Sequence, residues 1–516
     1  MKALVAAGLF IVLLPLLVSI YEVSLLQESA WEMLQSAKLW QSVGGSLLLA
    51  LSSGLAGAFI GVPAAYFLAK YKLPLNKLWL ILLILPLVTP SYISAYSYLA
   101  AFGNGGFFEQ LTGVNFPFTV KGSLFGAWLS MTMVNFPFVF LMTYTAMLNL
   151  PASLEESAMS LGATRKEVFF TVILPNIKVP VISGTLMIAL YSLSDFGTPA
   201  IMNYRTLTFE IFNYWDSGFL QHAAVFTILL IMIASLILLS EGIVNRNSFY
   251  IQKDRNCTPS RRLRPSKKMT LAVLSLFTII TFFSLVIPIG TIFYWAFKGR
   301  NALKINDTLT SAISGSTTLA IMTAVFTLFV ALPIAWYTVR GKGLFAWLSD
   351  KIAFMGNMVP GVVIAVSLAA IFPKLSWGEW TLYGTIAMPV IGCGIRFLPQ
   401  AVSALKTTLV QIAPSLEEAS SILGQSSGRT LCKITGPLIL PGALAALALV
   451  FITTIKELPI TLMMSPPGNK FLTQIIWDFQ DDGEYSRIAL PALFLLTISS
   501  LSLFFILKQN KSIEYE

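Results

Sequence analysis

Long apolar stretches recur along the whole chain and constrain its fold more than any other feature. Twelve of them are long enough to cross about 30 Å of hydrocarbon, near residues 3–21, 44–69, 78–102, 122–148, 176–195, 223–244, 270–296, 312–338, 347–372, 381–405, 438–456 and 487–507. Only 11% of the residues are charged, against about 25% in soluble domains. The sequence therefore predicts an all-α integral membrane protein of twelve helices. It excludes a soluble enzyme, a nucleic-acid-binding protein and a disordered scaffold.

The basic residues predict the orientation. With the N-terminus inside, most Lys and Arg fall in the inner segments, as the positive-inside rule requires. The largest group lies in residues 245–269. We expect both termini on the cytoplasmic side of a bacterial inner membrane. Residues 245–269 are then a cytoplasmic linker in contact with anionic lipid, which ordinary topology favours over a lipid or nucleotide sensor.

The second half of the sequence repeats the first, which predicts two six-helix halves related by a pseudo-two-fold axis along the membrane normal. Three prolines recur at matching places: Pro63 with Pro333, Pro90 with Pro360, and Pro137 with Pro399. A proline inside a membrane helix removes a backbone hydrogen bond, so the same kink in both halves indicates a shared architecture. We divide the chain into a first half (1–244), a basic linker (245–269) and a second half (270–516).

The clearest repeat follows the fourth and the tenth stretch. Leu154-Glu155-Glu156 with Leu161-Gly162 corresponds to Leu416-Glu417-Glu418 with Leu423-Gly424, at a constant offset in residue number. The same offset pairs Pro175 with Pro437, Asp195 with Glu457, Phe209 with Phe471 and Trp215 with Trp477. An offset kept over so long a segment indicates duplication rather than chance.

Each repeated loop predicts a short amphipathic helix across the cytoplasmic end of the bundle. Leu154, Ala158 and Leu161 have the i, i+4, i+7 spacing of one helical face. Gly162 permits a sharp turn, after which a second helical stretch runs toward the membrane. Such a helix suits a groove on another protein. The alternative is an interfacial helix that only caps the bundle, and the duplicated Glu and Gly spacing favours docking.

These loops resemble the EAA loop of ATP-binding-cassette importer permeases. The matching residues are Glu155, Glu156, Ala158, Gly162 and Pro175 in the first loop, and Glu417, Glu418, Ala419, Gly424 and Pro437 in the second. The resemblance implies the type I ABC importer permease fold, two copies of a cytoplasmic ATPase subunit that bind the loops, and a periplasmic or lipoprotein substrate-binding protein. It also implies that Glu156 and Glu418 anchor the loops on the ATPase.

The chain itself lacks a G-x-x-x-x-G-K-[ST] phosphate-binding loop. We therefore expect ATP and Mg to be bound by the partner ATPase, with no cofactor in this chain. The sequence shows no convergent catalytic set, so we expect a transport permease rather than an enzyme.

Four polar residues in or near the predicted helices are candidates for the transport pathway or its gate: Asp195, Glu457, Arg396 and Tyr191. Burying such groups in a membrane is costly, so they usually serve a function. Hard cations such as ferric iron prefer carboxylate and phenolate oxygen, which suggests an outer gate or a transient cation site. The structural alternative pairs Glu457 with Arg396 or Lys456 and leaves Asp195 hydrogen-bonded to backbone at a helix end. No residue is assigned firmly as a metal ligand.

The sequences around these acids resemble permeases of the ferric iron uptake group, in which both halves are fused in one chain. The matching segments are Ser194-Asp195-Phe196-Gly197-Thr198-Pro199, Leu207-Thr208-Phe209, Lys456-Glu457-Leu458-Pro459-Ile460-Thr461-Leu462 and Pro466-Pro467-Gly468. Ferric iron is therefore the expected substrate. Permeases for thiamine and aminoethylphosphonate have a similar architecture and remain the alternatives.

Segments 196–222 and 458–486 are expected on the outer side, where a binding protein docks. They hold the acids Glu210, Asp216, Asp478, Asp481, Asp482 and Glu484, and the paired Trp215 and Trp477, which are candidates for receptor docking. The alternative is interfacial tryptophan with solvated acids.

A gradient-driven secondary transporter can also have twelve helices in two halves. It would need acids near the middle of its helices to carry a coupling ion. It would not need paired docking helices at the cytoplasmic face, so the repeated loops favour the importer permease.

Overall fold

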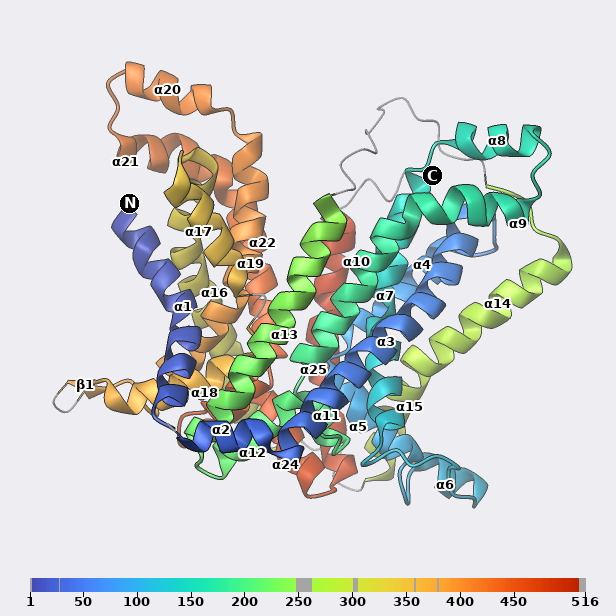
Figure 1. Cartoon of the computed structure of the whole chain (residues 1–516), viewed down its shortest axis with the longest axis horizontal. Helices are drawn as coiled ribbons and strands as arrows, with labels where there is room; N and C mark the ends of the chain where they lie inside the picture. The colour runs from blue at the N-terminus through green and yellow to red at the C-terminus, as the bar shows by residue number, and fades with distance from the viewer. Residues whose placement is uncertain are drawn as a thin grey trace.

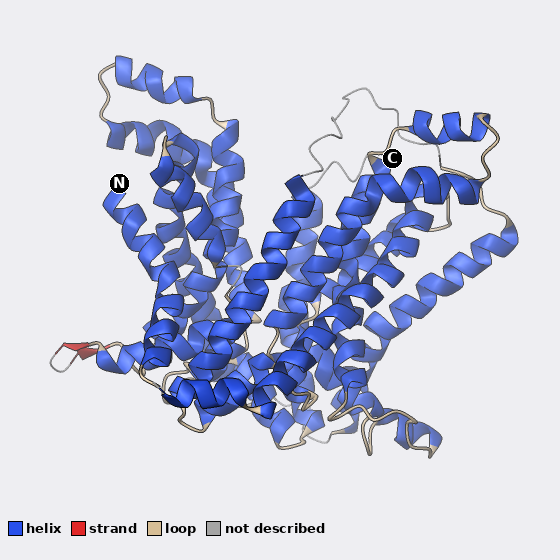
Figure 2. Ribbon diagram, in the orientation of Figure 1, coloured by secondary structure: helices blue, strands red, loops and turns tan. Residues whose placement is uncertain are grey.

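The structure is a computed structural model that describes residues 2–26, 28–246, 262–299, 305–356, 359–377 and 380–509. Helices make up nearly all of this part of the chain, as Figure 2 shows. The exception is a small antiparallel hairpin of β1 (Ser376–Trp377) and β2 (Trp380–Thr381), in which Trp377 pairs with Trp380. The expectation of an all-α membrane fold is confirmed.

The helices of the first half are α1 (Lys2–Ser24), α2 (Glu28–Gln35), α3 (Ala37–Lys70), α4 (Asn76–Ile84), η1 (Leu85–Val88), α5 (Ser91–Phe102), α6 (Phe107–Thr112), α7 (Leu124–Leu148), α8 (Ala152–Ser160), α9 (Arg165–Val168), η2 (Phe169–Ile173), α10 (Leu174–Ser194), α11 (Gly197–Ile201), α12 (Leu207–Asp216) and α13 (Leu220–Arg246). Those of the second half are α14 (Lys267–Thr281), η3 (Phe282–Val286), α15 (Ile287–Lys298), α16 (Asp307–Arg340), α17 (Leu344–Met355), α18 (Gly361–Ile371), η4 (Phe372–Lys374), α19 (Ala387–Gln411), α20 (Pro414–Ile422), α21 (Ser427–Thr430), η5 (Leu431–Thr435), α22 (Gly436–Ile455), α23 (Pro459–Met463), α24 (Leu472–Asp481) and α25 (Tyr485–Gln509).

Within the described residues, nine helices are long and apolar enough to cross a membrane. The pair Asn76–Val88 and Ser91–Thr112, bent by 96°, makes a tenth span if it is counted as one. Two shorter apolar helices, Gly361–Lys374 and Tyr485–Ser500, fall at the ninth and the twelfth predicted stretch. Each predicted stretch thus corresponds to an apolar helix or to a broken one.

The duplication is visible in the lengths and kinks of the helices. Both α3 and α16 have 34 residues, with Pro63 and Pro333 at the same position inside them. Both α7 and α19 have 25 residues and contain Pro137 and Pro399. A π-helical turn follows the first docking loop as η2 and the second as η5, and the two turns begin at corresponding positions of the repeat. The repeated prolines therefore do mark a repeated architecture.

The constant offset between the halves does not hold to the end of the repeat. It relates α11 to α23, but it no longer relates α12, which begins at Leu207, to α24, which begins at Leu472. The segment between the short helix and the next one is three residues longer in the second half. Trp477 is therefore the structural counterpart of Phe212, and the prediction that Trp215 and Trp477 occupy equivalent positions is wrong.

The first helix of each half packs against the other half. Helix α1 lies against α16, α17 and α18, and α15 lies against α5. Val5, Leu9 and Val12 are buried on one face of α1, because they follow the helical i, i+4, i+7 spacing. Polar contacts add to this packing, since the Lys374 ammonium lies 2.9 Å from a carboxylate oxygen of Glu22.

The bundle has two polar ends. Helices α8, α9, α20 and α21 lie at one end, and α2, α12 and α24 lie at the opposite end (Figure 1). We call these the α8–α20 face and the α12–α24 face. Helix α1 begins at the α8–α20 face (Figure 1). The predicted linker 245–269 lies mostly outside the described residues. Near its end, Leu263 pairs with the backbone of Lys70 and Lys72 beyond α3.

Candidate functional site

Two short helices project from the α8–α20 face, as the sequence predicts. Gly162 and Gly424 follow them with φ of +91° and +74°, values that favour glycine because it lacks a Cβ. The turns close with matching hydrogen bonds: Ala163 N donates to Ala158 O, and Gln425 N donates to Ser420 O, each at 3.1 Å. Beyond the turn, residues Arg165–Ser194 form one continuous span. Each short helix is therefore joined directly to a membrane helix.

These two helices leave large apolar and acidic side chains exposed. Leu161 is 89% exposed and Leu423 78% exposed, while Glu156 and Glu418 are exposed as well. Exposed apolar side chains on a helix that projects from the bundle are typical of a surface that another protein covers. Ala158 and Glu417 are partly buried and Ala419 is exposed. Pro175 and Pro437 are the second residues of α10 and α22.

Glu155 and Glu417 precede these two exposed glutamates, and their side chains point toward the bundle instead. Glu155 forms an ion pair with Lys70, the last residue of α3. Glu417 forms the equivalent pair with Arg340, the last residue of α16, with Arg340 Nε 3.4 Å from Glu417 Oε2. The sequence analysis did not single out Lys70 and Arg340. They are separated along the sequence by the same interval as Pro63 and Pro333, and this shared interval was the signal that could have identified them.

A cavity of about 590 Å³ lies between the halves, and we call it the central cavity. Asp195, Glu457, Arg396 and Tyr191 all line it. The structure thus brings the four predicted pathway candidates together. Polar groups that were not among those candidates also line it: Ser91, Ser194, Glu241, Gln400, Thr453 and Lys456.

The two principal acids of the central cavity have different partners. Asp195 accepts a hydrogen bond of 2.5 Å from Ser91 Oγ and one of 2.9 Å from the backbone N of Thr198. Glu457 lies 3.0 Å from Arg396 Nη1 in an ion pair. Within the chain segments described here, no group of three or more His, Cys, Asp or Glu residues could hold a metal ion. Each of these two acids is therefore held by neighbouring groups of the chain.

A glycine makes the ion pair possible. A Cβ on Gly361 would lie 1.8 Å from Arg396 Nη1 and 2.5 Å from Glu457 Oε1. The counterpart of Gly361 in the first half is Ser91, which also begins its helix after a proline. At this position the first half places a hydroxyl beside its acid, and the second half leaves room for a guanidinium.

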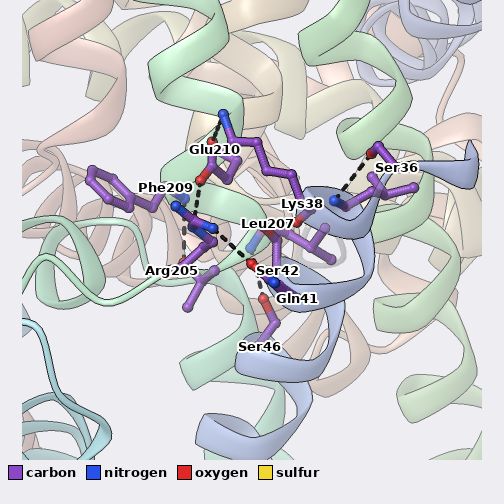
Figure 3. Close-up of polar contacts among 11 residues, drawn as sticks. Ser36, Lys38, Gln41, Ser42, Ser46, Arg205, Leu207, Phe209 and Glu210 are labelled. Atoms are coloured by element: carbon purple, nitrogen blue, oxygen red, sulfur yellow. Dashed lines mark hydrogen bonds and ion pairs between the residues drawn. The ribbon is translucent and has the colours of Figure 1, made fainter. Parts of the chain in front are cut away.

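On the α12–α24 face, Glu210 is buried and ion-paired, so it is not available to a partner as the sequence suggested. Lys38 Nζ lies 2.7 Å and Arg205 Nε 3.2 Å from its carboxylate oxygens, and Arg205 Nη1 donates to Gln41 at 2.8 Å (Figure 3). The backbone N of Leu207 donates to Ser46 Oγ at 2.8 Å. These contacts fasten α12 to α3.

The two candidate docking tryptophans are half-buried at the boundary between the halves. Trp477 stacks on Phe196 with ring centroids 5.4 Å apart and also contacts Phe212, which in turn packs against Trp215. The acids near Trp477 remain more open. Partial burial raises the pKa of Asp478, and the neighbouring carboxylates of Asp481 and Asp482 act in the same direction.

Residues 57–248 and 328–514 each match the family described as "Binding-protein-dependent transport system inner membrane component". Together they cover more than half of the chain, so the protein belongs to this family, and the double match confirms the duplication. It is a transport permease, and its apolar helices make it a membrane protein.

The relatives differ in how much of this chain they match. The chain is 27% identical over 486 residues to the "Fe(3+)-transport system permease protein FbpB 2" of Haemophilus influenzae, covering 92% of this chain and 91% of that protein. It is 24% identical to the "Ferric transport system permease protein FbpB" of Actinobacillus pleuropneumoniae, covering 90% of this chain and 70% of that one. The "Molybdenum transport system permease protein ModB" of Escherichia coli is 32% identical over 162 residues, covering 31% of this chain and 69% of the relative.

Proposed function

We propose that this permease moves ferric iron from an extracytoplasmic binding protein into the cytoplasm, driven by ATP hydrolysis on separate ATPase subunits. The observation that carries the proposal is the similarity to FbpB proteins over nine-tenths of the chain. The relatives of other substrate classes match only part of it. Thiamine and aminoethylphosphonate remain the alternative substrates, and a gradient-driven transporter is the alternative class.

The α8–α20 face is the docking surface for two copies of the ATPase in this proposal. Its two projecting helices are duplicated and exposed, and a short turn joins each of them to the helical segment that leads into a membrane span. Both chain ends then lie on the cytoplasmic side, and the α12–α24 face meets the binding protein through its open acids and the region of Trp215 and Trp477.

The central cavity is the pathway or gate between the two faces. Asp195, Glu457 and Tyr191 supply the oxygen atoms that a hard cation prefers. Arg396 neutralises Glu457 in the observed arrangement. Passage of a cation would require this ion pair to open, so the pair would act as a barrier in the resting state.

The test is uptake of radioactive iron into proteoliposomes that contain the permease, its ATPase and its binding protein. We expect uptake only with all three components and ATP. Uptake driven by a proton or sodium gradient without ATP would refute the pump. ATP-driven uptake of thiamine in place of iron would refute the assignment of iron as the substrate.

A variant tests the docking helices. Glu156→Ala with Glu418→Ala should lower uptake by on the order of tenfold, because coupling between two sites commonly contributes about 5- to 150-fold. ATPase activity no longer stimulated by the binding protein would accompany that loss. Lys72→Ala with Lys342→Ala, at two exposed residues just beyond α3 and α16, is the control. Unchanged uptake in the double variant would contradict the docking assignment.

A further inference from the structure

We propose that Lys70 and Arg340 are positioning residues for ATP-coupled transport. Each one clamps a docking helix to the end of the second long helix in its own half, so that the helix and the membrane domain move as one body. The inference rests on the proposed function of α8 and α20.

The clamp of the first half is buried. The Lys70 side chain is only 4% exposed and that of Glu155 13% exposed, and the two form an ion pair. A second contact joins α3 to the segment that follows α8, since the rings of Tyr66 in α3 and Phe169 in η2 meet edge to face at 4.9 Å. Because the ion pair is shielded from water, loss of one partner leaves the other charge poorly solvated.

The clamp of the second half has an additional bond. Arg340 Nε lies 3.4 Å from Glu417 Oε2, and Arg340 Nη2 donates to the carbonyl of Ile412 at 2.8 Å. Thr435 Oγ1 donates to Glu417 Oε1 at 3.2 Å. The planar guanidinium therefore holds the end of α19, at Ile412, together with α20, which a lysine ammonium has too compact a head to do.

The two clamps occupy equivalent positions in the repeat. Lys70 and Arg340 end helices of equal length, and Glu155 and Glu417 stand at equivalent positions in α8 and α20. Other cations nearby do not pair in this way. Lys72 and Lys342, two residues further on in each half, are exposed and form no ion pair within the described part of the chain. The pairing is thus a property of one position, not of basic residues at this face in general.

The mechanical reason lies in the turns beside the docking helices. Gly162 and Gly424 adopt positive φ, and a Cβ there would meet nothing within 4 Å, so these turns are not packed against the bundle. Helix α3 packs on α7 and α10, and α16 packs on α19 and α22. An ion pair to α3 or α16 fixes each docking helix to the centre of its half. Without it, movement of an ATPase would be lost in reorientation of the docking helix.

The experiment compares Lys70→Ala, Arg340→Ala and the double variant with the controls Lys72→Ala and Lys342→Ala. Iron moved per ATP hydrolysed is measured in proteoliposomes with the ATPase and the binding protein. We expect the double variant to lose on the order of tenfold in this ratio, with basal ATP hydrolysis retained. Amide hydrogen exchange over residues 152–162 should be faster in Lys70→Ala than in Lys72→Ala.

Charge exchange separates positioning from folding. Lys70→Glu with Glu155→Lys should restore most of the ratio that either single substitution loses, and it decides the question if the alanine variants fail to insert. Arg340→Lys should retain the ion pair, lose the bond to Ile412 and give an intermediate ratio. If the double alanine variant moves as much iron per ATP as the unmodified protein and shows the same amide hydrogen exchange, the clamp is refuted and the proposed function is not. Absence of ATP-driven uptake in the unmodified protein would instead refute the proposed function, and the clamp with it.

Discussion

Helices α12 and α24 are held at equivalent positions in the two halves, but by partly different side-chain contacts. A serine hydroxyl accepts a 2.8 Å hydrogen bond from the first residue of each helix, Ser46 from Leu207 and Ser316 from Leu472. Nearby, the first half buries Glu210 between two cations. The counterpart of Glu210 in the second half is Ile475, which is buried among apolar residues.

The central cavity shows the same contrast. Asp195 is held by neutral donors, and Glu457 by Arg396. Backbone requirements, such as helix length, tight turns and places of close approach, are therefore duplicated, whereas the ionic side chains around Glu210 and in the central cavity are specific to each half. The repeat specifies one architecture, and a substrate pathway built on it need not be symmetric.

The largest effect on stability should come from placing a glutamate in the second half at the position equivalent to Glu210. Ile475→Glu buries a carboxylate where Thr308 and Ser311 stand in place of Lys38 and Gln41, and where the exposed Lys470, the counterpart of Arg205, is the one cation kept of the two around Glu210. We expect the free energy of unfolding in detergent to fall by about 3–5 kcal/mol.

Two variants complete that test. Thr308→Lys, added to Ile475→Glu, should recover part of the stability. Glu210→Ile should cost less, about 1.5–3 kcal/mol, because its partners Lys38 and Arg205 are 43% and 51% exposed and can return to water. Equal losses for Ile475→Glu and Glu210→Ile would break the comparison.

A duplicated feature should respond equally in both halves. A Cβ on Gly45 would lie 2.2 Å from the carbonyl oxygen of Arg205, and one on Gly315 2.6 Å from that of Lys470. Because the opposing atoms are backbone, they cannot move aside cheaply. Gly45→Ala and Gly315→Ala should each lower thermal stability by about 1–3 kcal/mol. Gly44→Ala, whose Cβ meets nothing within 4 Å, is the control, and a loss confined to one half would argue against equivalence.

The pathway should respond unequally. Gly361→Ala pushes the flexible end of Arg396 away from Glu457. Because the unpaired Glu457 then retains an entering cation and the barrier cannot form again, we expect iron uptake to fall about tenfold, equivalent to about 1.4 kcal/mol. Ser91→Ala removes one of two bonds to Asp195 and should have a smaller effect, since Thr198 still donates. Gly290→Ala, in open space on α15, should leave uptake unchanged. Identical losses for Gly361→Ala and Ser91→Ala would show that the asymmetry has no function.

The sequence predicted the repeated architecture because local patterns encode it. Apolar stretches, prolines within helices and glycine turns are visible without three-dimensional information, and the structure has each of them in place. Matching tryptophans by identity failed, because the segment from Met464 to Phe471 is longer than its counterpart from Met202 to Thr206. Loop length varies between repeats more readily than helix length.

The ion pair of Glu457 with Arg396 was one of the alternatives that the sequence offered, and the structure contains it. The partners of Glu155, Glu417 and Glu210 could not be assigned from the sequence. Lys70 and Arg340 look like ordinary basic residues at the end of a span, and their partners Glu155 and Glu417 lie two membrane helices further along the chain. The acid at Glu210 looks like a solvated loop residue, since nothing local shows that α12 folds back onto α3. Only the approach of distant helices reveals which charges are buried and paired.

The packing of α1 against the second half has a consequence for biogenesis. Ser19 and Glu22 contact Ser367 and Lys374, which are translated much later. Because a ribosome adds about 5 to 20 residues each second, the partners of Ser19 and Glu22 in the second half appear roughly 20 to 70 s after α1 itself. During that interval the newly inserted helix holds a carboxylic acid and a hydroxyl that lack their final neighbours. During assembly of this permease, the translocon, a chaperone or the lipid headgroups must therefore contact these side chains of α1 until the second half is synthesised.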